Sequence, residues 1–116
     1  MIDHVLAVVP VTDIAAAREW YERLMGREPD NNPMDTLIEW QVVDHGWLQV
    51  TVDPARAGTA MVNLAVDDLA RQLSETVSRG ITVGEIHPAS KGVEFCPIND
   101  PDGNIITLIA NFRVTY

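Results

Sequence analysis

The strongest constraint on the fold is an internal repeat. The segment Val11-Thr12-Asp13-Ile14 follows an apolar, β-branched run and starts a helical pattern, and Val66-Asp67-Asp68-Leu69 does the same. The two segments begin at positions 11 and 66, so they lie 55 residues apart. A self-similar period of this length indicates two copies of one supersecondary unit, which here begins with a strand followed by a helix.

Both helical patterns have an apolar stripe and a boundary at each end. Apolar residues recur at spacings of three and four, which predicts one buried face beneath a charged surface. The stripe residues are Ile14, Ala17, Tyr21, Leu24 and Met25 in the first helix, and Leu69, Leu73 and Val77 in the second. The capping candidates are Thr12 or Asp13 and Asp67 or Asp68 at the amino ends, with Gly26 and Gly80 at the carboxyl ends.

Short strands separated by turn residues follow each helix. The expected strands are 5–11, 27–30 (weak), 36–43 and 47–53 in the first half, and 61–66, 81–87, 93–98 and 104–112 in the second. Turns are expected at residues 44–46 and 99–103, where Asp102-Gly103 suits positive φ angles. Each half therefore has one strand, a helix and three more strands.

Neither half can close a core alone, so the two are expected to pack together with their helices on the outside. The sequence predicts an α+β fold in a single domain, residues 1–116. Two tandem βαβββ modules, 1–53 and 59–116, are joined by a linker at 54–58. Their mixed sheets are expected to curve around a central pocket.

The charge of the chain disfavours one class of partner. Seventeen acidic residues against eight basic ones give a net charge of −9, which repels phosphate backbones. Ten of the acids lie in residues 1–53. Nucleic acid is therefore not expected as a partner, and a cationic ligand is favoured. Solubility alone would also explain the charge.

Cysteine usage and hydropathy predict a cytoplasmic protein. Cys96 is the one cysteine and cannot form an internal disulfide. The amino-terminal residues show no signal-peptide pattern, and no apolar stretch approaches the ~20 residues of a membrane-spanning helix. We expect no membrane partner.

Two sets of motifs resemble a known superfamily. The run Val9-Pro10-Val11-Thr12-Asp13-Ile14, with Trp20-Tyr21 and Leu24-Met25-Gly26, is similar to the opening of vicinal oxygen chelate proteins. Asp100-Pro101-Asp102-Gly103-Asn104 is similar to their closing hairpin. With the repeat, the resemblance covers nearly the whole chain. This superfamily includes glyoxalase I, extradiol dioxygenases and the metal-free bleomycin resistance proteins.

The resemblance implies four metal-ligand positions, typically His or Gln and Glu, on the first, fourth, fifth and eighth strands. Those positions fall on Leu6, Met61 and Thr107, and on Gln49 or its neighbours Val50 and Thr51 in the fourth strand. Leucine offers no ligand atom and a thioether is soft, so we expect no divalent metal and no other cofactor. His4 shares the face of Leu6 and leaves open a displaced ligand.

Strand alternation predicts which residues line the pocket. The candidates are Leu6, Ile38, Trp40, Trp47, Gln49, Thr51, Met61, Asn63 and Thr107, with Ile105 beside the last. Such a lining suits a small organic ligand held by packing and a few hydrogen bonds. Alternatively, Trp40, Trp47 and Met61 fill the interior or a dimer interface. Glu39 is expected on the opposite face unless a bulge shifts its strand.

Three functions remain open on the sequence. The first is metal-independent binding of a small cationic or aromatic molecule, similar to bleomycin resistance proteins. The second is a glyoxalase-like lyase, isomerase or dioxygenase with an altered metal site that uses His4 and Gln49, or water, as ligands. The third is a metal-free enzyme in which Glu94 or another carboxylate moves a proton. The missing ligands favour binding over catalysis, and open sheet edges favour a homodimer. Cys96 is interpreted as a buried small residue.

Overall fold

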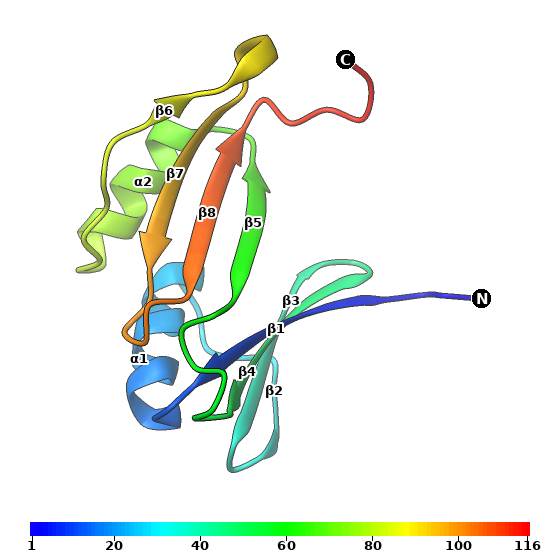
Figure 1. Cartoon of the computed structure of the whole chain (residues 1–116), viewed down its shortest axis with the longest axis vertical. Helices are drawn as coiled ribbons and strands as arrows, with labels where there is room; N and C mark the ends of the chain where they lie inside the picture. The colour runs from blue at the N-terminus through cyan, green and yellow to red at the C-terminus, as the bar shows by residue number, and fades with distance from the viewer.

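The computed structural model describes residues 1–116 and shows the two expected modules (Figure 1). The first module consists of β1 (Val5–Val11), α1 (Ile14–Met25), β2 (Asn31–Met34), β3 (Leu37–Val43) and β4 (Gly46–Val52). The second consists of β5 (Met61–Val66), α2 (Leu69–Ser78), β6 (His87–Pro88), the 3₁₀ turn η1 (Ser90–Gly92), β7 (Glu94–Asn99) and β8 (Ile105–Ala110). The predicted βαβββ repeat is confirmed.

Each module forms one mixed four-stranded sheet. The strand orders are β1-β4-β3-β2 and β5-β8-β7-β6, so the second sheet repeats the topology of the first. In each, the first strand runs parallel to the last, and the remaining pairs are antiparallel. Figure 1 shows both helices on one side of the molecule and no closed barrel. The predicted α+β class is confirmed.

The helix boundaries follow the predicted capping residues closely. Asp13 accepts from the amides of Ala15 and Ala16, and Asp68 accepts from that of Arg71. Helix α1 ends at Gly26, whose φ of 73° lies in the left-handed region that glycine adopts without strain. Asp13 and Asp68 are therefore the amino-terminal caps, and the alternative candidates Thr12 and Asp67 are not.

One residue of the second apolar stripe was wrongly predicted. Val77 is 52% exposed, whereas Thr76 is buried. The Thr76 hydroxyl donates to the carbonyl of Gln72 at 2.8 Å, which satisfies its polar atom inside the core. A threonine can therefore take the inner position of the helix, and Val77 turns outward.

Two predicted strands differ from the structure. The weak strand at 27–30 instead lies at β2, where Asn31 pairs with Glu39. The strand expected at 81–87 is reduced to His87 and Pro88, because only these two residues pair with β7. Ile81 is buried, so the preceding segment is anchored by its apolar side chain without a ladder of hydrogen bonds. The remaining strands match within two residues.

A single core joins the two modules. Its 17 buried apolar residues come from both sheets and both helices, among them Val9, Tyr21, Leu48, Leu73 and Ile106. No helix covers the face of each sheet that points away from this core. Leu6 and Val8 in β1 are about half exposed, and Met61 in β5 is 81% exposed. These uncovered sides are called the open faces below.

The hairpin between β7 and β8 fastens the second module to the first. The Tyr21 hydroxyl donates to Asp100 Oδ2 at 2.7 Å, and Asn104 Nδ2 donates to the carbonyl of Pro10 at 2.8 Å. At the surface, the Thr12 hydroxyl donates to Asp102 Oδ1 at 2.7 Å. The Asp-Pro-Asp-Gly-Asn motif is thus a structural joint between the modules.

Candidate functional site: the open faces of the two sheets

Three strands of the first module build one open face. In the parallel β1–β4 pair, Leu6 lies beside Trp47 and Val8 beside Gln49. In the antiparallel β3–β4 pair, Glu39 lies opposite Gln49. Residues paired in this way point to the same side of a sheet. Leu6, Trp47, Gln49 and Thr51 therefore lie on the open face as predicted.

Ile38 and Trp40 were placed on this face by the sequence, and that prediction is wrong. They are 1% and 0% exposed and lie opposite Val50 and Leu48, on the side that packs against α1. The cause is a register shift: Val43 pairs with Gly46, but Gln41 pairs with Trp47. Counted back from the turn that precedes Gly46, the extra residue in β3 lies between Gln41 and Val43, so it places Glu39, and not Ile38 or Trp40, on the side of Gln49.

Trp40 is a core residue that also satisfies its polar atom. Its indole Nε1 donates to the carbonyl of Arg27 at 3.1 Å. Its ring centroid lies 6.1 Å from that of Tyr21. The alternative interpretation of Trp40 as interior packing is therefore the one the structure supports, whereas Trp47 stays half-buried on the open face.

The same bulge brings Glu39 onto the open face. Its carboxylate accepts from Gln49 Nε2 at 2.8 Å and from Asn31 Nδ2 at 3.1 Å. Sequence alternation had assigned Glu39 to the other side, with the bulge as the stated exception. Glu39 is thus a residue of the candidate site that alternation without the bulge misses.

The second open face is apolar and neutral. Met61 lies beside Ile105 in the parallel β5–β8 pair, and Asn63 lies beside Thr107. Pro97 lies opposite Thr107 in β7. Met61, Asn63, Thr107 and Ile105 therefore share a face as predicted, two residues from each strand.

The predicted residues do not all line one cavity. An apolar groove of about 400 Å³ runs between the β3–β4 hairpin and β5 and brings Trp47 near Asn63. Its other lining residues are Val5, Ala7, Val42, Val43, Gly46, Val62, Leu64 and Ala65. Leu6, Gln49, Thr51, Met61 and Thr107 lie outside this groove, spread over the two open faces.

The residues at the four expected ligand positions do not fit a divalent metal. Leu6 and Met61 are largely exposed apolar side chains, and Thr107 is a neutral hydroxyl. Val50 is buried on the helix side, and the Gln49 amide is bonded to Glu39. No group of three or more His, Cys, Asp or Glu side chains in residues 1–116 could hold a metal ion.

His4, the candidate for a displaced ligand, lies outside the strand. It precedes Val5, the first residue of β1, and its Nδ1 lies 3.2 Å from the carboxylate of Asp3. Its ring packs edge-on against that of His45, with the centroids 5.2 Å apart. Val5 pairs with Gly46 and Val8 pairs with Gln49, so His4 lies four positions along the sheet from the residue beside Gln49.

The other reactive candidates lie apart from the open faces. Glu94 is exposed at the start of β7, opposite Pro88. Cys96 is 0% exposed on the helix side of the same strand, as predicted for a small buried residue. Burial raises the pKa of the Cys96 thiol, which disfavours the nucleophilic thiolate.

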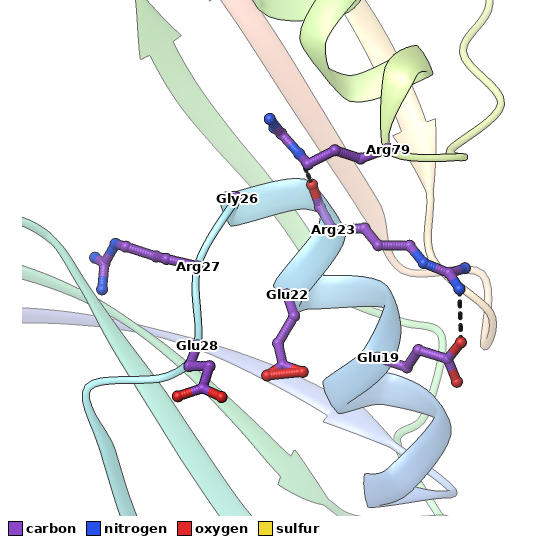
Figure 2. Close-up of a pocket in the computed structure, with 7 residues that line it drawn as sticks. All are labelled: Glu19, Glu22, Arg23, Gly26, Arg27, Glu28 and Arg79. Carbon is purple, nitrogen blue, oxygen red and sulfur yellow. Dashed lines mark hydrogen bonds and ion pairs between the residues drawn. The ribbon is translucent and has the colours of Figure 1, made fainter.

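A charged depression of about 490 Å³ lies between the carboxyl end of α1 and Arg79, the residue that follows α2 (Figure 2). The Arg79 guanidinium donates to the carbonyls of Arg23 and Leu24 in the last turn of α1. Arg23 in turn pairs with Glu19 at 2.6 Å. Because Arg79 and Arg23 already bind groups of the protein, this depression is a structural contact between the modules.

The comparisons with known proteins agree with this geometry. The profile of the glyoxalase-like domain family matches residues 6–109, and the chain belongs to that family. A glyoxalase / bleomycin resistance protein from Catenulispora acidiphila is similar at 34% identity and a TM-score of 0.86, covering 92% of this chain and 96% of that one. No curated protein sequence matches the chain significantly.

Two further solved structures share the fold. A bleomycin-binding protein complexed with bleomycin has 24% identity and a TM-score of 0.78, over 95% of this chain and 99% of that one. Lactoylglutathione lyase from Agrobacterium tumefaciens has 17% identity and a TM-score of 0.76, over 92% of both chains. The fold is therefore shared by a binding protein and an enzyme, so it does not decide between them. Neither helix is long and apolar enough to cross a membrane.

Proposed function

We propose that this protein binds a small organic molecule, cationic or aromatic, on the open faces of its sheets and does so without a metal ion. The observation that carries the proposal is the composition of those faces. Leu6, Met61 and Thr107 stand where the enzymes of the superfamily would place ligands, and they offer packing surface and one hydroxyl. Such groups recognise a ligand by shape and a few hydrogen bonds.

We further propose that two copies of the chain enclose the ligand. Leu6, Val8 and Met61 are exposed on the open faces of the single chain, where their apolar surface is in contact with water. Covering these side chains with a second copy would remove that surface from water, at about 25 cal/mol per Å² of apolar area. The single buried thiol of Cys96 suits a reducing compartment, and we propose the cytoplasm.

Ligand binding is tested by tryptophan fluorescence. Bleomycin and a panel of aromatic and cationic compounds are titrated into the protein, and the half-buried Trp47 is expected to report saturable quenching. Trp47→Phe should lose that signal. Thr107→Arg should weaken binding at least tenfold, because the new side chain fills the open face. The matched control Val114→Arg, in the exposed tail, should bind normally.

Saturable changes with none of these compounds would contradict the binding function. Metal independence has its own measurement: nickel, zinc or iron ions are expected to leave both the melting temperature and ligand affinity unchanged. Stoichiometric metal in protein purified without chelators, with a raised melting temperature, would overturn that part of the proposal.

Dimerisation is tested separately by sedimentation. The expected mass at micromolar concentration is twice the chain mass of 12.8 kDa. Met61→Glu should shift the equilibrium toward the single chain, and Glu85→Gln, away from the open faces, should not. A wild-type protein that sediments as one chain would refute the dimer. The proposed ligand binding would then be decided by the fluorescence titration alone.

A further inference from the structure

Glu39 is the one Asp, Glu, Lys or Arg among the strand residues of the two open faces. Its neighbours across β4 and β1 are Gln49 and Val8, and the second open face carries neutral residues such as Asn63 and Thr107. The half-buried carboxylate of Glu39 therefore sets the charge of this surface.

No cation of the protein neutralises this carboxylate. Glu39 takes part in none of the ion pairs of the structure. The amides of Gln49 and Asn31 hold it in place with one hydrogen bond to each oxygen. An ionised carboxylate has about four acceptor sites, so both oxygens keep capacity for a further donor.

An aromatic side chain lies on the same face, one step along the strand. Trp47 is two residues from Gln49 in β4 and pairs with Gln41, which is two residues from Glu39 in β3. This diagonal arrangement is within reach of large side chains. Indole is the side chain that attracts a cation most strongly through its ring face. Leu6 lies beside Trp47 and adds apolar surface.

We propose that Glu39 is the specificity-determining residue of the open face and that, with Trp47, it selects an organic cation. The class is a protonated amine, a guanidinium or a quaternary ammonium group on a flat apolar body. The cation lies between carboxylate and indole, and the apolar body packs on Leu6. The net charge of −9 favours the approach of such a ligand. This inference rests on the proposed binding function.

The experiment compares two probes of equal shape and different charge. (4-Hydroxyphenyl)trimethylammonium carries a quaternary nitrogen where 4-tert-butylphenol carries a quaternary carbon. Both are titrated into the wild-type protein by ligand-observed NMR. The cation is expected to bind about tenfold more tightly, which corresponds to 1.4 kcal/mol. Glu39→Gln keeps the size of the side chain and removes its charge, so most of the tenfold preference should be lost and only the smaller contribution of the Trp47 ring should remain.

The control is Glu28→Gln, which removes one charge from an exposed loop residue and should leave the tenfold preference intact. Trp47→Leu provides a second variant, expected to weaken the cation several-fold more than the phenol. Equal affinities in the wild type, or a tenfold preference that survives undiminished in Glu39→Gln, would overturn the inference and leave small-molecule binding standing. Binding of neither probe at millimolar concentration would overturn the inference and also count against the binding function.

Discussion

The Tyr21 hydroxyl and Asp100 Oδ2 lie 2.7 Å apart, although the two residues are separated by 79 positions in the chain. Tyr21 belongs to α1 of the first module and Asp100 to the hairpin of the second, and both are buried. The Asp100 carboxylate also accepts from the amides of Asp102 and Asn104 and from the Asn104 side chain. A buried polar network therefore determines how the modules are joined.

Removing the hydroxyl of Tyr21 should weaken this joint. Tyr21→Phe keeps the ring in the core and leaves Asp100 with one donor fewer, so the free energy of unfolding should fall by about 1–3 kcal/mol. Urea denaturation followed by circular dichroism measures the change. Tyr116→Phe alters an exposed tyrosine at the end of the chain and serves as control. Equal stabilities of the two variants would contradict the role of the hydrogen bond.

Alkaline pH should destabilise the protein through the same residue. Burial, and then the negative charge of Asp100, raises the pKa of Tyr21 above its ordinary value of 10.0. The contribution of the protonated Tyr21 hydroxyl to the free energy of unfolding is complete at pH values below the pKa of this tyrosine in the unfolded chain. It is lost progressively as the pH rises above that value. Urea midpoints measured at about pH 8 and about pH 11 should fall more in the wild type than in Tyr21→Phe. Parallel declines would show that Tyr21 does not carry the effect.

Asn104 should be the most sensitive polar position of the hairpin. It is 0% exposed, its Oδ1 accepts from the amide of Ala60 and its Nδ2 donates to Pro10 and Asp100. Asn104→Ala leaves these partners unsatisfied in the core, at an expected cost of about 2–4 kcal/mol. Thermal and urea unfolding measure this loss, and Asn99→Ala, at an exposed position, should cost less than about 0.5 kcal/mol.

The two tryptophans of the first sheet should respond in opposite ways. Trp40→Ala removes a fully buried ring and its bond to Arg27, which should destabilise the protein by about 3–5 kcal/mol. Trp47→Ala, on the open face, should change stability far less and abolish ligand binding instead. Unfolding and binding measurements on both variants decide this. If Trp40→Ala kept its stability and lost ligand binding, the placement of Trp40 in the core would be contradicted.

Arg79 should contribute to the contact between the modules. Its guanidinium binds the carbonyls of Arg23 and Leu24 at the carboxyl end of α1, where a cation is favoured by the helix dipole. Arg79→Met keeps the apolar stem and should cost about 1 kcal/mol in urea unfolding. Arg71→Met, at an exposed position of α2 with an ion pair to Glu75, is the matched control. A larger loss in the control would refute the capping role.

Several features of the fold could be predicted because they depend on residues close together in the chain. Examples are the apolar stripe of α1, the narrowing of the caps to Thr12 or Asp13 and to Asp67 or Asp68, and Gly26 as terminator, which are local patterns with local causes. Because similar segments begin at positions 11 and 66, the single helices and strands could also be grouped into two equivalent modules. The positions of Leu6, Met61 and Thr107 as expected ligand sites rest on the resemblance to the superfamily, and the absence of a metal stays a prediction.

The sequence by itself determined the two modules, the succession of strand, helix and three strands in each, and the apolar character of Leu6 and Met61. Only the tertiary structure decided which side chains of β3 lie on the open face, because one bulged residue moves Trp40 into the core and Glu39 out of it. Strand alternation has a period of two, so a shift of a single residue reverses every assignment beyond it. Whether that shift occurs depends on the pairing of β3 with β4 and on the packing of Trp40 against Tyr21, which brings together residues far apart in the chain.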